Sequence, residues 1–302
     1  MQIKKILVPT DFSETSNKAV SQAIMLAVKY RAEVVALHAR VLYQDDPSQI
    51  PQRLELLREK EEKIEAELLD HMKRQIKRAD VPKIKHEIIR GYSAPSAILN
   101  YINNNKFDLV VIGTHGRSGL GHFLIGSVAE KVVRYANCPV LTVHNRSEAR
   151  EEFKHLLVPF DFSDHARFAL TVALEMAESE QTRVTLLYAV DRAVHPALYA
   201  WGMKSIFDII PDIVEKAKRK MDEVIAGIPN PSKAKIEKKI VEGVAHSEII
   251  NFVNNSDVDL VVMATKGLVG MDRLLLGSTT EKVIRGAQVQ LLTLKQPVST
   301  PQ

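Results

Sequence analysis

The sequence predicts an α/β fold made of two repeated domains, each a five-stranded parallel sheet with helices on both faces. Strand-like and helix-like segments alternate along the 302 residues, which is typical of parallel sheets whose strands are joined through helices. Several strand segments are unbroken apolar runs, which suit strands buried on both faces. The segment that starts the first half also returns near the middle of the chain, and the length is enough for two domains with cores of their own.

Two pairs of matching segments define the repeat. Ile6–Ser13 (ILVPTDFS) returns 150 positions later as Leu156–Ser163 (LLVPFDFS), and Asp108–Val111 (DLVV) returns 151 positions later as Asp259–Val262. A period of about one domain indicates a duplicated domain rather than a solenoid. The join between the halves is short and polar, so we expect the halves to pack together. The expected domains are residues 1–145 and 153–296.

In the first half, each element follows from a local pattern. Ser13 is a suitable N-cap for a helix whose apolar residues recur at helical spacing, and a long charged helix carries a similar stripe. A short helix covers Ala97–Asn103, and another starts at Ser127. The expected strands are Lys4–Val8, Glu33–Ala39, Lys85–Arg90, Asp108–Ile112 and Cys138–Val143. The inward positions of the first and the long helix are Ala19, Ala23, Leu26 and Ala27, and Leu54, Leu57, Ile64, Leu68 and Met72.

The second half repeats this order of elements. Its last strand is expected at Gln288–Leu294. The inward stripe of its long helix is Ile210, Ile213, Ala217, Met221 and Val224.

Composition indicates a globular protein with neither a nucleic-acid surface nor a membrane segment. The chain is 45% hydrophobic and 26% charged, and its net charge of +4 comes from interspersed charges of both signs. One cysteine excludes an internal disulfide and fits a reducing compartment. No apolar run approaches membrane-spanning length, and Met1–Pro9 starts a strand rather than a signal peptide. We therefore expect a cytoplasmic protein.

A glycine-rich stretch, Gly113–Ser127 (GTHGRSGLGHFLIGS), leaves the carboxyl end of a buried strand and enters a helix. Ligands of open parallel sheets bind at that edge. Glycines let the backbone approach a ligand closely, and a helix start offers unpaired N–H groups to phosphate. The stretch therefore predicts a phosphate site. It is not a P-loop, because no Gly-Lys-Ser/Thr follows, and the histidines and the cysteine lack zinc-site spacing.

These motifs together resemble a tandem universal stress protein. The resemblance rests on two Ile/Leu-Leu-Val-Pro-x-Asp-x-Ser starts, a Gly-x-x-Gly-(nine residues)-Gly-Ser loop and a Cys-Pro-Val-Leu terminal strand, and it covers nearly the whole chain. It implies a Rossmann-like α/β sandwich of the adenine-nucleotide hydrolase-like superfamily. Family members with this glycine pattern bind ATP, whereas a second branch lacks the pattern and does not.

The resemblance also implies which residues would contact ATP in the first half. The residues after the first strand would meet adenine and ribose, the backbone of Ala39 would meet the adenine edge, and the glycine loop and the helix start would hold the phosphates. Asp11 could instead be a turn residue, Ser127 could instead be an N-cap, and His115 and Arg117 could instead be solvated. The implied contacts are Pro9, Thr10, Asp11, Ala39, Gly113, His115, Gly116, Gly126, Ser127 and Val128.

The second half departs from this pattern. Ala264 replaces Gly113, Lys266 replaces His115 and Phe160 replaces Thr10, so a methyl group would crowd the backbone that must approach phosphate. We expect the first half to bind ATP more tightly and the second to be weak or vacant. The candidate contacts that remain there are Asp161, Gly267, Gly277, Ser278 and Thr279.

Three functions remain open from the sequence. The leading one is an ATP-binding stress-response or regulatory protein with at most slow hydrolysis, because the loop holds no acidic residue and His115 is the one candidate base. The alternative is an enzyme of the wider superfamily that cleaves ATP or transfers a nucleotidyl group. A third is a ligand-free structural pseudo-dimer. The sequence leaves open whether Mg²⁺ accompanies ATP.

The terminal strands of the two halves suggest how the protein assembles. Apolar sheet edges invite pairing, and family members pair terminal strands across a dimer. The two halves would then form a pseudo-dimer within one chain, and two chains could associate further as a homodimer.

Overall fold

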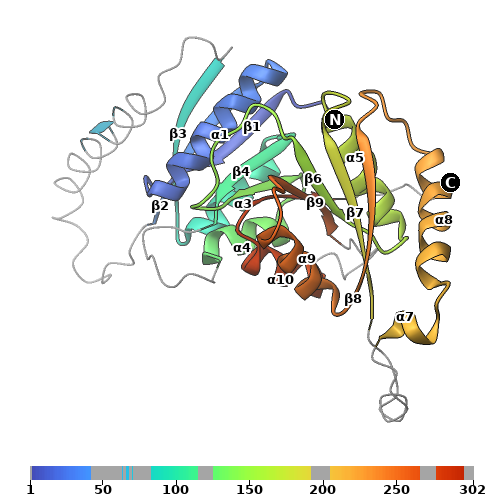
Figure 1. The fold of residues 1–302 in the computed structure, drawn as a ribbon. Coiled ribbons are helices and arrows are strands. Elements are labelled where there is room, and N and C mark those ends of the chain that lie inside the picture. The colour runs from blue at the N-terminus through green and yellow to red at the C-terminus, as the bar shows by residue number, and fades with distance from the viewer. Residues whose placement is uncertain are drawn as a thin grey trace, which may run out of the picture. The chain divides into compact units, whose positions relative to one another are not determined.

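The computed structural model of the protein describes residues 2–41, 63, 66, 67, 70, 83–114, 125–191, 205–265 and 277–295. The described residues up to 151 form one compact unit, and those from 152 onward form another. Each unit is an α/β layer structure (Figure 1).

The first unit holds a five-stranded parallel sheet, as the sequence predicts. Its strand order is β3-β2-β1-β4-β5, and every described neighbour pair in this unit is parallel. The strands are β1 (Lys5–Pro9), β2 (Glu33–Val41), β3 (Lys83–Gly91), β4 (Leu109–Gly113) and β5 (Val140–Val143). The helices are α1 (Glu14–Tyr30), α3 (Ala94–Asn104) and α4 (Ser127–Tyr135).

The second unit repeats this sheet with the strand order β8-β7-β6-β9-β10, again parallel throughout its described pairs. Its strands are β6 (His155–Pro159), β7 (Arg183–Val190), β8 (Lys235–Glu242), β9 (Leu260–Thr265) and β10 (Gln290–Lys295). Its helices are α5 (Asp164–Met176), α7 (Ile206–Ile209), α8 (Ile213–Ala226), α9 (Ala245–Asn254) and α10 (Ser278–Gly286).

The order of the strands fixes where a ligand can bind. In the first unit the chain adds β2 and β3 on one side of β1, and then returns to add β4 and β5 on the other side. Right-handed connections therefore place α1 on one face of the sheet and α3 and α4 on the other. The chains leaving β1 and β4 diverge at their carboxyl ends and open a crevice, which is the usual ligand site of such sheets. The second unit has the same reversal between β6 and β9.

Local signals account for the elements that were predicted. Ser13 caps α1 by accepting a hydrogen bond from the backbone of Ser16, and Ser163 caps α5 from Ala166 in the same way. The central strands are buried except for one half-buried residue at an end of each, which explains their unbroken apolar runs. The predicted inward residues of α1 are buried, and these are Ala19, Ala23, Leu26 and Ala27.

Other elements differ from the prediction. Helix α8 begins at Ile213, so Ile210 lies outside it and is exposed, whereas Ala217, Met221 and Val224 form its buried stripe as expected. The short helix α7 was not predicted, and it is held by the carboxylate of Glu242, which accepts from the hydroxyl of Ser205 and the amide of Ile206. The long charged helix expected around residues 54–72 lies mostly outside the described residues.

The segment after β5 packs on α1 and is not a detached linker. The buried side chain of Gln22 accepts from the amide of Arg150 and donates to its carbonyl, both at 2.8 Å. Lys18 donates to the carbonyl of Asn145 nearby. Residues 145–150 are therefore held to the first unit at two points.

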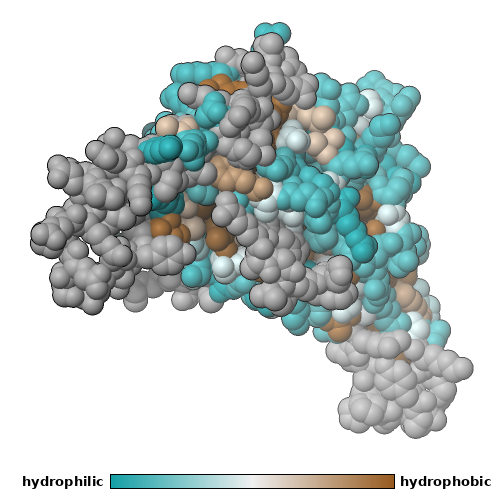
Figure 2. Space-filling model, turned by 90° about the vertical axis from the view of Figure 1, so that its left-hand side faces the viewer, coloured by the Kyte–Doolittle hydropathy of each residue, from teal (hydrophilic) through white to brown (hydrophobic). Residues whose placement is uncertain are grey.

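Few large apolar side chains are exposed on the described surface. Figure 2 shows hydrophilic residues over much of the described surface, with small separate apolar patches. No described helix is both long and apolar enough to cross a membrane. The large apolar residues that are exposed are Val41, Tyr92, Tyr135, Ile210 and Val244.

Candidate functional site

A cavity of about 340 Å³ lies at the carboxyl ends of β1 and β4, in the crevice that the strand order creates. Its volume is within the usual range of small-molecule sites. It brings together predicted residues from the end of β1, from β2, from the end of β4 and from the start of α4. The predicted residues that line it are Pro9, Thr10, Asp11, Ala39, Gly113, Gly126, Ser127 and Val128. Two predicted residues, His115 and Gly116, lie outside the described residues, as does Arg117.

The end of β1 is held rigidly beside this cavity. The amide of Thr10 donates to the carbonyl of Leu37 at 2.8 Å, and its hydroxyl lies 3.1 Å from the hydroxyl of Ser16. His38 donates from Nδ1 to the carbonyl of Thr10 at 2.8 Å, because a carbonyl oxygen can only accept. Asp11 accepts the amide of Ser13 at 3.1 Å, so it is a turn residue and a cavity residue at the same time.

Ala39 is in register with Ile89 of β3, but no described strand pairs with it on the β1 side, where the cavity lies. In a parallel strand, alternate residues direct both backbone groups to the same neighbour. Leu37 bonds toward β1, since its carbonyl accepts from Thr10, so the N–H and C=O of Ala39 also point to the β1 side. Pairing between β1 and β2 ends at Pro9 and Leu37, although β2 itself continues to Val41. Ala39 therefore presents a donor and an acceptor that a flat heterocycle could use.

Helix α4 begins beside the cavity with an open N-terminus. Gly126 is its N-cap and supplies no side-chain hydrogen bond, so Ser127 is the first helical residue and not the cap that the sequence also allowed. The amides of Ser127, Val128 and Ala129 have no acceptor within the helix. Gly126 has φ −61°, which any residue adopts, so its backbone conformation does not require glycine. The open amides and the helix dipole together favour an anion.

Gly113, at the end of β4, has a different structural role from the one that the sequence predicts. A Cβ on Gly113 would lie 3.0 Å from the carbonyl carbon and oxygen of Thr15 and 3.1 Å from the nitrogen of Ser16. These are backbone atoms at the start of α1. Gly113 therefore allows α1 to pack closely on β4, in addition to lining the cavity.

Sequence reasoning missed several lining residues of the first cavity. His38 and Ser16 reach it because both are tied to Thr10, and this link depends on how α1 and β2 pack on β1. The lining residues from α3 come from the helix on the opposite face, which no local pattern connects to the glycine loop. The missed lining residues are Ser16, His38, Ala94, Ile98, Ile112, Thr114 and Ala129.

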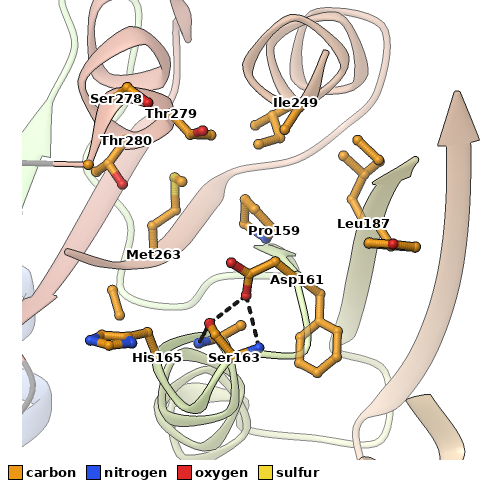
Figure 3. Close-up of a pocket in the computed structure, with 17 residues that line it drawn as sticks. Pro159, Asp161, Ser163, His165, Leu187, Ile249, Met263, Ser278, Thr279 and Thr280 are labelled. Atoms are coloured by element: carbon orange, nitrogen blue, oxygen red, sulfur yellow. Dashed lines mark hydrogen bonds between the residues drawn. The ribbon is translucent and has the colours of Figure 1, made fainter. Parts of the chain in front are cut away.

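The second unit has a cavity of about 300 Å³ at the equivalent place (Figure 3). The predicted residues Asp161, Gly277, Ser278 and Thr279 line it, whereas Gly267 and Lys266 lie outside the described residues. Oδ1 of Asp161 accepts from the amide and the hydroxyl of Ser163, at 3.0 and 2.5 Å.

Three polar side chains that line the first cavity are replaced at the equivalent positions of the second. Phe160, Ala166 and Tyr188 stand where the first unit has Thr10, Ser16 and His38. Phe160 and Tyr188 belong to an aromatic cluster around Phe162, with ring centroids 5.3 and 4.9 Å from it. These three positions therefore offer fewer side-chain hydrogen bonds to a ligand in the second cavity than their equivalents in the first.

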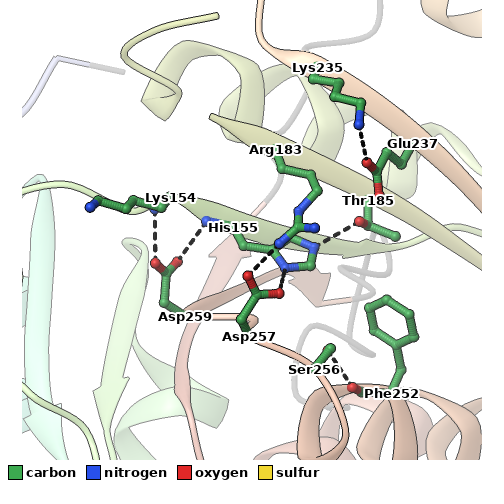
Figure 4. A network of polar contacts seen from close by, with 10 residues as sticks. All are labelled: Lys154, His155, Arg183, Thr185, Lys235, Glu237, Phe252, Ser256, Asp257 and Asp259. Carbon is green, nitrogen blue, oxygen red and sulfur yellow. Dashed lines mark hydrogen bonds and ion pairs between the residues drawn. The ribbon is translucent and has the colours of Figure 1, made fainter. Parts of the chain in front are cut away.

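A second polar cluster, at the amino ends of β6 and β7, has the order carboxylate, imidazole and hydroxyl (Figure 4). His155 lies 2.9 Å from Asp257 through Nδ1 and 2.8 Å from the hydroxyl of Thr185 through Nε2. Chemically this is the order of a nucleophilic triad. His155 and Thr185 are only 3% and 2% exposed, however, so the hydroxyl cannot reach a substrate. We assign the cluster to structure.

The same cluster lowers the pKa of the carboxyl group of Asp257. The hydrogen bond from His155 is the largest cause that holds the pKa of Asp257 below its ordinary value, and Arg183 adds a further hydrogen bond. Among the described residues, no group of three or more His, Cys, Asp or Glu side chains could hold a metal ion.

Comparisons of the sequence and of the structure with known proteins both match universal stress proteins. Residues 2–144 and 152–295 each match the model of the Universal stress protein family. Universal stress protein MJ0531 of Methanocaldococcus jannaschii is 38% identical over 144 residues, which are 46% of this chain and 81% of that protein. A universal stress protein structure from Archaeoglobus fulgidus covers 98% of this chain and 100% of its own, with TM-score 0.64 and 22% identity, and so shares the fold. A universal stress protein solved in complex with cAMP is 26% identical, covers 48% of this chain and 99% of its own, and has TM-score 0.36.

Proposed function

The chain belongs to the universal stress protein family, and from this premise we propose that its first half binds ATP and acts as a nucleotide-dependent stress-response regulator. The observation that carries the proposal is the open N-terminus of α4 at the cavity between β1 and β4. Backbone amides and a positive dipole end favour phosphate there.

The remaining walls of the first cavity suit the rest of an adenine nucleotide. The unpaired backbone groups of Ala39 match the donor and acceptor edge of a purine. Asp11 lies at the end of β1, where a carboxylate can accept from ribose hydroxyls. Ile98 and Ile112 supply apolar surface for the faces of the base. Where Mg²⁺ accompanies ATP, we place it on the phosphate oxygens, which are its usual partners in nucleotide sites.

We favour binding over turnover. Hydrolysis needs a base close to the attacking water. Among the described lining residues of the first cavity, Asp11 is the one carboxylate, and it lies at the β1 end, whereas the open amides belong to α4. We therefore propose that ATP occupancy, rather than its cleavage, carries the regulatory signal.

We propose that the second half binds ATP more weakly. Ala264 places a methyl group at the position of Gly113, and Phe160 and Ala166 remove two hydroxyl groups from the wall. Asp161 already accepts two hydrogen bonds from Ser163 through Oδ1. The loss of the two hydroxyl groups reduces the polar contacts available to ribose and base.

The direct test is to denature freshly purified full-length protein and identify the released small molecules by chromatography and mass spectrometry. We expect ATP in near-equimolar amount. Protein that carries no nucleotide is then titrated with ATP by calorimetry, with and without Mg²⁺. Absence of both co-purified nucleotide and measurable binding would refute the proposed function.

A further inference from the structure

The second cavity carries a thioether where the first cavity carries a hydrocarbon side chain. Met263 lies near the end of β9, at the position that Ile112 occupies in β4, and each lines the cavity of its own unit. Met263 is 7% exposed, and its side chain extends from β9 toward the start of α10 (Figure 3). The cavity of about 300 Å³ has room for water and for molecules of similar size. A small oxidant that enters the cavity can therefore reach this side chain while the unit stays folded.

A hydroxyl group without a described protein partner lies in the same cavity. Thr280 belongs to the first turn of α10 and is only 4% exposed. No described residue forms a hydrogen bond with its hydroxyl group, yet the oxygen keeps some exposed surface, and Thr280 lines the cavity. The equivalent residue of the first unit is Ala129, which has no polar side-chain group. Buried hydroxyl groups are nearly always paired, so this one needs a partner that the described residues do not supply.

The two differences from the first unit lie close together. Figure 3 shows the side chain of Met263 directed toward Thr279 and Thr280. Packing does not require either residue, because the first unit buries Ile112 and Ala129 at the same positions. A thioether is a weak acceptor, so reduced Met263 does little for the hydroxyl group. Oxidation changes this, because methionine sulfoxide is polar and its oxygen accepts hydrogen bonds.

We propose that Met263 is a site of oxidation by hydroperoxides, with Thr280 as the hydrogen-bond donor to the sulfoxide that forms. A sulfur lone pair attacks one oxygen of hydrogen peroxide, and the S–O bond forms as the O–O bond breaks. The proton on the transferred oxygen passes to the departing oxygen, which leaves as water. Sulfur loses two electrons, which the peroxide gains. The hydroxyl of Thr280 can relay this proton, because it both accepts and donates.

The same contact makes the oxidised side chain compatible with the fold. A sulfoxide usually disrupts an apolar core. At Met263 the new oxygen accepts from the hydroxyl of Thr280, so oxidation supplies the hydrogen bond that the reduced protein lacks. The first unit has no equivalent reaction, since Ile112 contains no sulfur. The second unit therefore responds to oxidants at its cavity, and this response does not depend on whether either cavity binds a nucleotide.

Two other methionines of the second unit provide internal references. Met176 and Met221 are 5% and 0% exposed, and neither lines one of the two cavities. Oxidation by a dissolved reagent depends on access to the sulfur. Both residues should therefore stay reduced in the folded protein while Met263 reacts.

The test treats the folded full-length protein with hydrogen peroxide and follows each methionine by peptide mass spectrometry. Urea-unfolded protein gives the rate of each methionine without structure around it. Thr280→Val removes the hydroxyl group and keeps the shape of the side chain, whereas Thr280→Ser keeps the hydroxyl group. Met263→Leu, treated in the same way, reports how oxidation of all other methionines changes the midpoint of urea unfolding. Circular dichroism establishes that each variant is folded.

We expect Met263 in the folded protein to be oxidised at least about tenfold faster than Met176 and Met221. Thr280→Val should slow this reaction at least about threefold, and Thr280→Ser should keep most of the parent's rate. After subtraction of the change seen in Met263→Leu, oxidation should lower the urea midpoint more in Thr280→Val than in the parent. The inference is overturned if Met263 reacts no faster than the two references, or if Thr280→Val matches the parent in either the rate or the midpoint.

Discussion

Replacing Ser127 with glutamate should weaken ATP binding without weakening the fold. Ser127 is the exposed first residue of α4, so a longer side chain has room among the described residues, and its carboxylate lies at the open amides. An acidic residue in the first turn of a helix usually stabilises that helix by about 0.3–1 kcal/mol. The same negative charge opposes a phosphate group that uses those amides. Stability and affinity should therefore change in opposite directions.

The loss of affinity can be bounded from electrostatics. At a separation of roughly 5 Å, one carboxylate and one phosphate charge repel each other by about 0.8 kcal/mol in bulk water and by about 3 kcal/mol at an effective dielectric constant of about 20. The mouth of the cavity lies between these limits, because Ser127 is exposed while Ala129 beside it is buried. An increase of the ATP dissociation constant by roughly tenfold to a hundredfold follows. The increase should shrink at high salt, which screens exposed charges.

Calorimetric titration of ATP at two salt concentrations, together with urea unfolding of the ligand-free protein, measures both effects. The matched control is Ser278→Glu, which makes the same change at the first, equally exposed residue of α10. It should leave ATP binding to the first cavity within about twofold, as expected for distant sites. If Ser127→Glu binds ATP as tightly as the unmodified chain, the phosphates do not use the α4 amides and the proposed site is wrong.

Two further predictions concern stability. Gly113→Ala should destabilise the first unit by about 1–3 kcal/mol in urea unfolding, since its Cβ would lie 3.0 Å from backbone atoms of α1. Gly277→Ala has its nearest contact at 3.7 Å and should cost less than about 1 kcal/mol, for the loss of a glycine N-cap. Equal effects would contradict this packing argument. The depressed pKa of Asp257, caused chiefly by the hydrogen bond from His155, means that its carboxylate stabilises the fold above its ordinary value of 3.8 and that this contribution is lost as the pH falls through the lower folded-state value. Asp257→Asn should therefore flatten the decline of the urea midpoint below about pH 4, and an unchanged decline would exclude this contribution.

The elements and their order could be predicted because each has a local signal. Apolar runs give the buried strands, and serine caps give the starts of α1 and α5. The cap of α4 could not be predicted in the same way. Both Gly126 and Ser127 suit an N-cap, and only the backbone geometry decides for the glycine. Helix α7 does have a local signal, the capping box of Ser205 and Asp208, which the prediction did not use. Its further support from Glu242, 37 residues from Ser205, could not be read from a local pattern.

The candidate site could be predicted only in part, for a similar reason. Positions at the end of β1 and at the start of α4 follow from the rule that parallel strands bind ligands at their carboxyl edge. His38 and His165 do not follow from that rule. The first reaches the cavity through a hydrogen bond to Thr10, and the second because it occupies the early turn of α5 beside the end of β9. Such positions depend on tertiary packing, which no spacing in the sequence records.

Equivalent contacts hold the elements around the cavity in both halves. Differences between the residues that line the two cavities are therefore informative. Phe12 and Phe162 both take a left-handed conformation, with φ 65° and 64°, which is unfavourable for a residue that is not glycine. Each ring contacts the aromatic side chain of the second strand, with centroids 4.9 Å apart in both units.

The amino edges of the sheets match as well. Asp108 accepts the amides of Lys4 and Lys5, and Asp259 accepts those of Lys154 and His155. The fold therefore uses the same backbone hydrogen bonds at these positions in both halves.

A substitution that lines a cavity but leaves these supports unchanged is not explained by the needs of the fold. Thr15 and His165 are such a pair, because α1 and α5 start at equivalent residues with equivalent serine caps. The first unit buries a threonine there, whereas the second places an imidazole whose Nε2 has no described protein partner. A buried nitrogen of this kind costs stability unless something binds it, by about 1–3 kcal/mol. His165→Phe should therefore raise the midpoint of urea unfolding, and an unchanged or lower midpoint would contradict this cost.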